Sequence, residues 1–300
     1  MQHQAPVPWL AYASLAASMA LVGSYVGLSR LLVALFPVFL LAWLRFGIAA
    51  VAMAGWVRRA PDEVPLGRHE RVLLFWESFL GNFLFSVCML FGVAATSAVA
   101  AGVVMATIPA IVALLSWAFL GERVSRRVQA GIACAVAGVG LLALAKAPAS
   151  ATPAPWWGYA LLLAAAVCEA SYVVIGKRLT AGVSPKRISA LINLWGLALV
   201  TPLGVWQAWQ FDFGSVAVSS WGLLLFYALA ASMVTVWLWM LGLRQVPAPR
   251  AGVFTVFLPL ASTAVGVLFL GEHLGAGQAA ALGLALVGLL LATWPGASRR

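Results

Sequence analysis

Apolar residues occur along the chain in ten long runs separated by short polar stretches. Each run has about the 20 residues that a helix needs to cross the hydrocarbon core of a bilayer. The runs predict ten membrane-spanning helices, at residues 9–29, 34–57, 72–93, 98–120, 127–145, 156–177, 187–208, 219–243, 251–270 and 276–294. The pattern therefore predicts an all-α integral membrane protein.

The composition supports a lipid environment. Hydrophobic residues make up 64% of the chain and charged residues only 9%, whereas soluble domains carry about 25% charged residues. The net charge is +10, but the 18 Lys and Arg residues are scattered among the loops instead of forming one basic face. We therefore expect a lipid bilayer as partner, and no nucleic acid.

The distribution of these cations predicts an orientation. Fifteen of the 18 Lys and Arg residues fall on one side of the predicted helices, against Arg30 and Lys146 on the other side. Cytoplasmic loops of membrane proteins carry an excess of Lys and Arg. Both termini are therefore expected in the cytoplasm, with the protein in the inner membrane of a bacterium.

The second half of the chain repeats the first at an offset of 150 residues. Ala101–Val103 corresponds to Ala251–Val253, and Phe119–Glu122 corresponds to Phe269–Glu272. We predict a first five-helix repeat over 9–146, a linker over 147–155 and a second repeat over 156–294. Since each half has five spans, the second copy must be inverted in the membrane. Many secondary transporters have this architecture, with the substrate site between the repeats.

Three stretches resemble EamA-type members of the drug/metabolite transporter superfamily: Ala42–Ala50, Thr107–Leu144 and Phe257–Gln278. The resemblance implies ten spans and export of small metabolites across the bacterial inner membrane by alternating access. It also implies a central cavity lined mainly by the first, third and fourth helices of each half.

Charged residues inside the predicted spans are candidates for function, because a charge at the bilayer centre costs about 2.5–3.5 kcal/mol on insertion scales. Glu169 lies about 20 Å into the sixth span, at 1.5 Å per residue. It could exchange protons, or it could be a protonated side chain bonded to a neighbouring helix. With Lys177 eight residues later, its segment resembles the first helix of the small multidrug-resistance transporters, where a membrane Glu handles proton and cationic substrate.

Four other charged residues have two interpretations each. Arg45 could bind a substrate carboxylate or take part in coupling, although we favour an anchor between helices to a backbone carbonyl or to a Glu. Glu77 is expected to extend to the inner interface, with a functional role as the alternative. Glu122 and Glu272 are expected to cap the helix that follows each of them, with a gate contact as the alternative.

Polar and aromatic side chains recur at helical spacing and are expected to face a cavity. The predicted cavity residues are Tyr25, Asn82, Ser86, Glu169, Tyr172, Ser232, Thr235 and Trp239. Ser14 and Ser18 share a stripe with Tyr25. For the serines, close packing of small residues between helices explains the pattern equally well.

Proline occurs at equivalent places in the fourth and ninth spans, as Pro109 and Pro259. Proline removes a backbone hydrogen bond inside a helix. We predict hinges at both positions, with static kinks as the alternative.

The remaining sequence narrows the function. It contains no HExxH or GxSxG motif and no paired Asp, so we expect no enzyme, no cofactor and no metal site. A carrier of nucleotide sugars would place several cations near the midplane, where only Arg45 lies. The sequence therefore predicts export of neutral or zwitterionic metabolites, above all amino acids, including aromatic ones. The alternative is a proton-coupled exporter of cationic drugs that uses Glu169.

Overall fold

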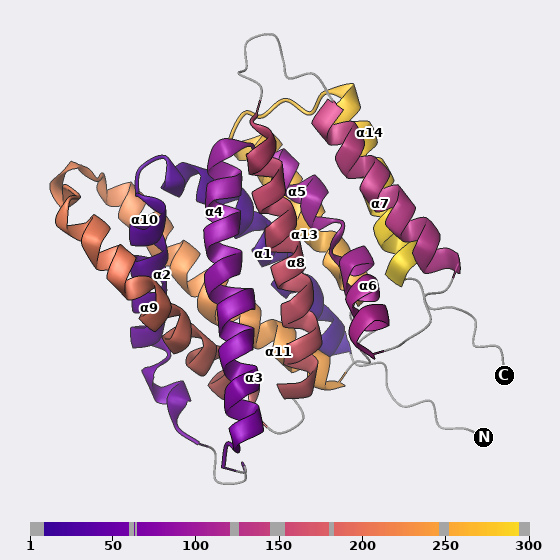
Figure 1. Cartoon of the computed structure of the whole chain (residues 1–300). Helices are drawn as coiled ribbons and strands as arrows, with labels where there is room; N and C mark the ends of the chain where they lie inside the picture. Colours follow the sequence, from indigo (N-terminus) through magenta and orange to yellow (C-terminus); the bar gives the residue numbers. More distant parts are fainter. Residues whose placement is uncertain are drawn as a thin grey trace.

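The computed structural model describes residues 9–59, 63, 65–120, 126–144, 154–179, 183–245 and 252–293. Helices form most of this part of the chain, which contains no strand (Figure 1). The predicted all-helical architecture is confirmed. The predicted linker lies almost entirely outside the described residues, as do Glu122 and Lys146.

The first half contains five helical spans. Its elements are α1 (Trp9–Val33), α2 (Val38–Ala52) with the short helix η1 (Ala54–Val57), α3 (Arg68–Ser78), η2 (Phe79–Leu84), α4 (Phe85–Ala95), α5 (Ala98–Met105), α6 (Ile108–Leu120) and α7 (Arg126–Leu144). The third span is continuous from α3 through η2 to α4. The fourth span is broken between α5 and α6.

The second half repeats this order. Its elements are α8 (Trp156–Leu179), α9 (Pro185–Trp209), η3 (Phe213–Ser215), α10 (Val218–Leu229), η4 (Ala230–Val234), α11 (Thr235–Gln245), η5 (Gly252–Val256), α13 (Phe257–Phe269) and α14 (Ala276–Thr293). Five stretches in the described residues are helical, long and apolar enough to cross a membrane: Trp9–Val33, Arg68–Ala95, Trp156–Gly176, Pro185–Trp209 and Val218–Gln245.

The two prolines lie at the start of helices instead of inside them. Pro109 is the second residue of α6, and Pro259 is the third residue of α13. In the first turn of a helix a missing N–H group breaks no intrahelical hydrogen bond. The expected interior kink is therefore replaced by the start of a new helix, and a hinge at either residue stays a prediction.

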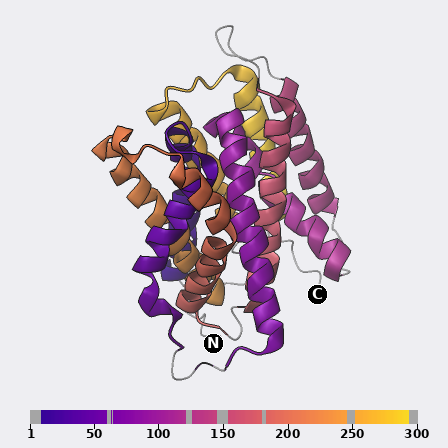
Figure 2. The same ribbon diagram turned by 60° about the vertical axis from the view of Figure 1, so that its left-hand side comes forward.

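The halves pack on each other with a reciprocal pattern. Helix α1 contacts α11 and α13 of the second half, and α8 contacts α4 and α6 of the first half. Helix α2 packs on its counterpart α9, and α7 packs on α14 (Figures 1 and 2). The first helix of each half thus lies against the third and fourth spans of the other half, as an inverted repeat requires.

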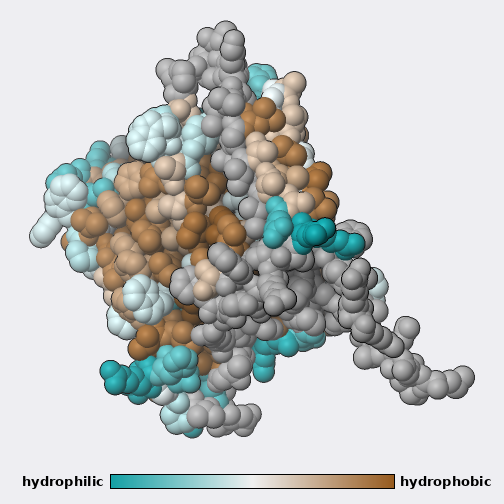
Figure 3. Space-filling model, turned by 45° about the vertical axis from the view of Figure 1, so that its right-hand side comes forward, coloured by the Kyte–Doolittle hydropathy of each residue, from teal (hydrophilic) through white to brown (hydrophobic). Residues whose placement is uncertain are grey.

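The outer surface of the helices is largely apolar, as expected for contact with lipid. Large apolar side chains such as Leu163, Leu194 and Leu225 are exposed on α8, α9 and α10. Figure 3 shows apolar side chains over the middle of one face and hydrophilic ones toward its lower edge.

Candidate functional site

A cavity lies between the two halves and holds about 470 Å³ of empty space, part of it open to solvent. Its walls come from both repeats. The lining residues are Ser18, Met19, Val22, Tyr25, Arg45, Gly81, Asn82, Phe85, Glu169, Tyr172, Ile192, Ala231, Thr235, Val236 and Trp239. Several of them are repeat-related pairs, among them Tyr25 with Tyr172 and Gly81 with Ala231.

Two irregular turns shape these walls. The segments η2 and η4 are π-helical turns inside the third and eighth spans, and they occupy corresponding positions in the two repeats. A π-helical turn widens the helix by one residue and occurs frequently at functional sites. Here the two turns carry Gly81 and Asn82 on one side and Ala231 on the other, all on the cavity wall.

Arg45 supplies the positive charge of the cavity and is only 2% exposed. Its Nη2 atom donates to Asn82 Oδ1 at 3.1 Å and to Ser86 Oγ at 2.7 Å. The guanidinium lies 4.2 Å from the ring centroid of Phe46 and 5.7 Å from that of Tyr227. Arg45 therefore joins α2 to the third span through the side chains of Asn82 and Ser86, not through the expected backbone carbonyl or Glu, and it also faces the cavity.

Glu169 is the acidic residue of the cavity wall and comes from α8. Glu169, Tyr172 and Gly176 follow at helical spacing, so they share the face of α8 that meets the third span. Gly81 allows the approach there, because a β-carbon at Gly81 would lie 2.7 Å from Tyr172 Cβ. Across the cavity, the ring of Tyr25 meets that of Tyr227 edge to face, with centroids 5.7 Å apart.

The structure places six of the eight predicted cavity residues on the wall: Tyr25, Asn82, Glu169, Tyr172, Thr235 and Trp239. Ser86 and Ser232 do not line the cavity. Ser86 instead holds Arg45, and Ser232 is buried in η4. Ser18, on the predicted stripe of α1, lines the cavity and donates to Thr235 O at 2.8 Å.

Glu77 does not extend to the membrane surface, so that expectation is wrong. Its side chain is 0% exposed and packs against α8, where a β-carbon at Gly176 would lie 2.7 Å from Glu77 Oε1. The side of α3 that carries Glu77 faces the protein interior. The sequence gives no signal that tells this side from the side facing lipid.

Several buried polar atoms around the cavity have no hydrogen-bond partner among the described residues. On the cavity wall they are Arg45 Nε, Tyr172 Oη and Trp239 Nε1, and outside the lining they are Ser232 Oγ and both carboxyl oxygens of Glu77. Buried polar groups are rarely left unpaired, because each costs about 1–3 kcal/mol. The three atoms on the wall are therefore open to water or to a polar ligand. Among all residues that the structure describes, no group of three or more His, Cys, Asp or Glu side chains could hold a metal ion.

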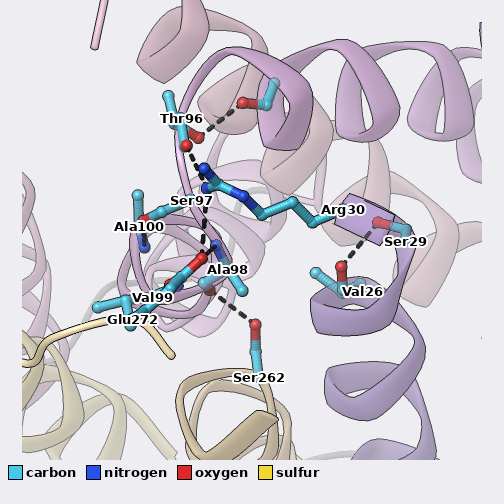
Figure 4. Close-up of polar contacts among 11 residues, drawn as sticks. Val26, Ser29, Arg30, Thr96, Ser97, Ala98, Val99, Ala100, Ser262 and Glu272 are labelled. Carbon is cyan, nitrogen blue, oxygen red and sulfur yellow. Dashed lines mark hydrogen bonds and ion pairs between the residues drawn. The ribbon is translucent and has the colours of Figure 1, made fainter. Parts of the chain in front are cut away.

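A second polar cluster ties α1 to α5 and to the segment after α13 (Figure 4). Arg30 Nη1 donates to Glu272 Oε1 at 3.2 Å and to Thr96 O at 2.5 Å. The Glu272 carboxylate accepts from the backbone N–H groups of Ala98 and Val99, both at 3.0 Å. We call these groups the Arg30–Glu272 cluster.

Glu272 therefore caps α5. The expectation that it caps α14, the helix that follows it in sequence, is wrong. The N-terminus of α5 offers free N–H groups and a positive dipole end, which favour a carboxylate. Ser97 completes the cap by accepting from Ala100 N at 3.0 Å, and Ser262 Oγ donates to Ala98 O at 2.8 Å. The cap joins the two repeats at one end of the bundle.

Long and shorter apolar helices in the described residues, packed reciprocally between two repeats around a cavity that Arg45 and Glu169 line, are the architecture of a membrane transporter built from an inverted repeat. Comparison with known proteins identifies the family. The model of the EamA-like transporter family matches residues 9–144 and again 156–294. The chain therefore belongs to this family.

Two proteins of Bacillus subtilis (strain 168) are similar to the chain. One, named "Uncharacterized transporter YetK", is 35% identical over 264 residues, covering 87% of this chain and 80% of its own length. The other, "Uncharacterized transporter YwfM", is 29% identical over 218 residues, covering 70% and 71%. A solved crystal structure with 19% identity shares the fold, with a TM-score of 0.63 over 94% of this chain and 96% of that one.

Proposed function

We propose that the chain exports zwitterionic amino acids, including aromatic ones, across a bacterial inner membrane by alternating access, with both termini in the cytoplasm. The observation that carries the proposal is that Arg45 and Glu169 both line the wall of one cavity. A zwitterion has one charge for each of these side chains, whereas an ion of a single sign would meet repulsion from one of them.

The polar atoms of the wall fit the two ends of an amino acid. Arg45 has its Nε atom open, with no partner in the described residues, and guanidinium groups bind carboxylates through directed N–H groups. The substrate ammonium would then lie near Glu169. Tyr25, Tyr172 and Trp239 line the same cavity and offer rings that bind ammonium groups and apolar side chains.

Two interrupted helices are the places where we propose that the protein bends during alternating access. The fourth span is interrupted between α5 and α6, and the ninth span changes from η5 to α13. Pro109 and Pro259 lie next to these two places. We assign the hinges of the movement to them, because an interrupted helix bends at less cost than a continuous one.

Uptake into proteoliposomes tests the proposal. The purified chain is reconstituted, and labelled aromatic, small neutral, acidic and basic amino acids are supplied alongside a labelled quaternary ammonium compound, with protein-free liposomes as background. We expect uptake of the neutral zwitterions above background. Transport of the quaternary ammonium compound alone would overturn the proposal and favour an exporter of cationic drugs.

The variant Glu169→Gln tests the role of the acid separately. Loss of the carboxylate removes the partner of the substrate ammonium, so we expect amino-acid uptake to fall about 10- to 100-fold, as for a lost hydrogen bond to a charged group. Gly47→Ala is the matched control, because a β-carbon there has open space. Unchanged uptake by Glu169→Gln would exclude Glu169 from the binding of the ammonium group.

A further inference from the structure

Glu77 is a carboxylic side chain buried in the membrane part of the protein that the substrate cavity does not use. It lies one residue before the end of α3 and is 0% exposed. It is not among the residues that line the cavity. In the part of the chain that the structure describes, neither of its oxygens has a hydrogen-bond partner.

An ionised carboxylate is very unfavourable in this environment. A buried charge needs a counter-ion or several hydrogen bonds, and without them the group takes up a proton and becomes neutral. Among the residues that the structure describes, Glu77 has neither a counter-ion nor a hydrogen bond. We therefore assign the neutral carboxylic acid to Glu77 in this conformation.

Helix α8 packs against α3 and carries two titratable groups of the cavity wall, Glu169 and Tyr172. The Tyr172 Oη atom has no partner among the described residues. Tyr172 lines the cavity and also packs against the third span at Gly81. Tyr172 thus belongs both to the cavity wall and to the contact between α8 and the span that carries Glu77.

Other charged groups on α3 and α9 contact residues other than Glu77. On α9, Arg187 Nη1 lies 3.4 Å from Glu63 Oε1, and Lys186 Nζ lies 5.7 Å from the ring centroid of Trp56. On α3 itself, Arg71 donates to Leu66 O. On α8, the side chains of Lys177 and Arg178 lie outside the description.

We propose that Glu77 is a proton-binding residue separate from the substrate cavity, and that proton exchange at Glu77 is coupled to the change in access of that cavity. The coupling rests on the proposed transport function. In the exchange, the O–H bond of the carboxyl breaks and the proton passes to water. The carboxylate that remains requires new donors, such as water and the Tyr172 hydroxyl, so the contact between α3 and α8 must loosen.

The geometry favours a proton over other cations. Glu77 is 0% exposed, and a β-carbon at Gly176 would lie 2.7 Å from Glu77 Oε1 and 3.1 Å from Met240 Cε, so the carboxyl is enclosed by close packing. A metal ion would also need several oxygen ligands. A proton needs neither space nor further ligands.

Infrared difference spectroscopy tests the site without any substrate. Spectra of the full-length purified chain are recorded between mildly acidic and alkaline pH, and the carbonyl stretch of protonated carboxylic acids is followed. We expect one component of this band to be lost in Glu77→Gln and kept in Glu169→Gln. An unchanged band in Glu77→Gln overturns the assignment, and loss of the same component in both variants overturns the separation of the two sites.

A labelling experiment tests the coupling. Cys88, Cys134 and Cys168 are replaced by Ala, and Ala231→Cys places one thiol on the cavity wall. We expect its rate of reaction with a water-soluble maleimide to change with pH, beyond the intrinsic reactivity of a free thiol, and this extra dependence to disappear in Glu77→Gln. Retention of the full dependence in Glu77→Gln overturns the coupling.

Monodisperse elution of each variant in gel filtration shows that it is folded, and glutamine has nearly the shape of glutamic acid. Neither measurement uses an amino acid. Failure of amino-acid uptake would therefore remove the proposed substrate class while leaving the proton site to be judged by its own results.

Discussion

The Arg30–Glu272 cluster and the central cavity differ in how many of their buried polar atoms have hydrogen-bond partners. In the cluster, both oxygens of the Glu272 carboxylate accept from backbone N–H groups, and one also pairs with Arg30. Around the cavity, Arg45 Nε, Tyr172 Oη and Trp239 Nε1 are buried and without partners in the described residues. The Glu272 carboxylate is thus fully paired where it joins the repeats, whereas these three atoms are open where a solute is proposed to bind.

This difference teaches how to separate stability from transport. A complete hydrogen-bond network stabilises one conformation, and its removal lowers stability. Open polar atoms destabilise the empty protein, and a ligand or water that completes them offsets that cost. Substitutions in the cluster should therefore act mainly on unfolding, and those in the cavity mainly on transport.

The largest effect is expected for Arg45→Gln. Loss of the guanidinium removes the proposed partner of the substrate carboxylate and a charge-assisted bond, worth about 1.5–3 kcal/mol, so initial uptake of a labelled aromatic amino acid should fall about 10- to 100-fold. Arg45→Lys keeps the charge but lacks the planar fork, and should retain part of the activity. Full uptake by Arg45→Gln would show that Arg45 is an anchor between helices and nothing more.

Gly81→Ala should destabilise the protein by about 1–3 kcal/mol, the usual cost of overpacking a tight contact. The new methyl group would collide with Tyr172 on α8. Gly47→Ala is the matched control, since nothing lies within 4 Å of a β-carbon there. The measurement is the apparent free energy of unfolding in detergent. Equal values for the two variants would mean that α8 and η2 can separate freely.

Glu272→Gln should lower the apparent free energy of unfolding by about 1–2 kcal/mol, because a carboxylate at a partly buried helix N-terminus contributes about that much. Uptake should change less than in Arg45→Gln. Asp212→Asn removes the same charge from an exposed cap, where Asp212 accepts from Gly214 N at 2.9 Å, and serves as control. A larger loss of uptake than of stability would place Glu272 among the groups that control access.

Hydropathy and the internal repeat predicted the helical fold, because lipid imposes length and composition on each span. The same signals could not predict the π-helical turns η2 and η4, which depend on packing between the halves and have no residue signature. They also could not show that the fourth span breaks before Pro109, so that this residue begins α6.

For the site, the residue type predicted a place on the cavity wall when that type is rare in membrane helices, and did not when it is common. Glu169 and Arg45 stand out in lipid-like sequence, and both lie on the cavity wall. Serine does not stand out, because it serves packing as well as binding, and Ser86 and Ser232 lie outside the lining. Glu272 was assigned to the helix next to it in sequence, but the N-terminus that it caps comes from the other repeat, which only the folded chain reveals.

The smallest effect compares the hydroxyl of Ser262, beside the Arg30–Glu272 cluster, with that of Ser232, which is buried in η4 next to the cavity residue Ala231. Ser262 Oγ donates to Ala98 O at 2.8 Å in the Arg30–Glu272 cluster, so Ser262→Ala should cost about 0.5–1.5 kcal/mol of unfolding free energy. Ser232 Oγ has no partner within the described part of the chain, so Ser232→Ala should leave stability unchanged or slightly raised. Both serines are buried and both substitutions remove one oxygen, so the comparison isolates the hydrogen bond. Equal losses of stability would show that the Ser232 hydroxyl is engaged in the folded protein, and the contrast between the two regions would no longer hold.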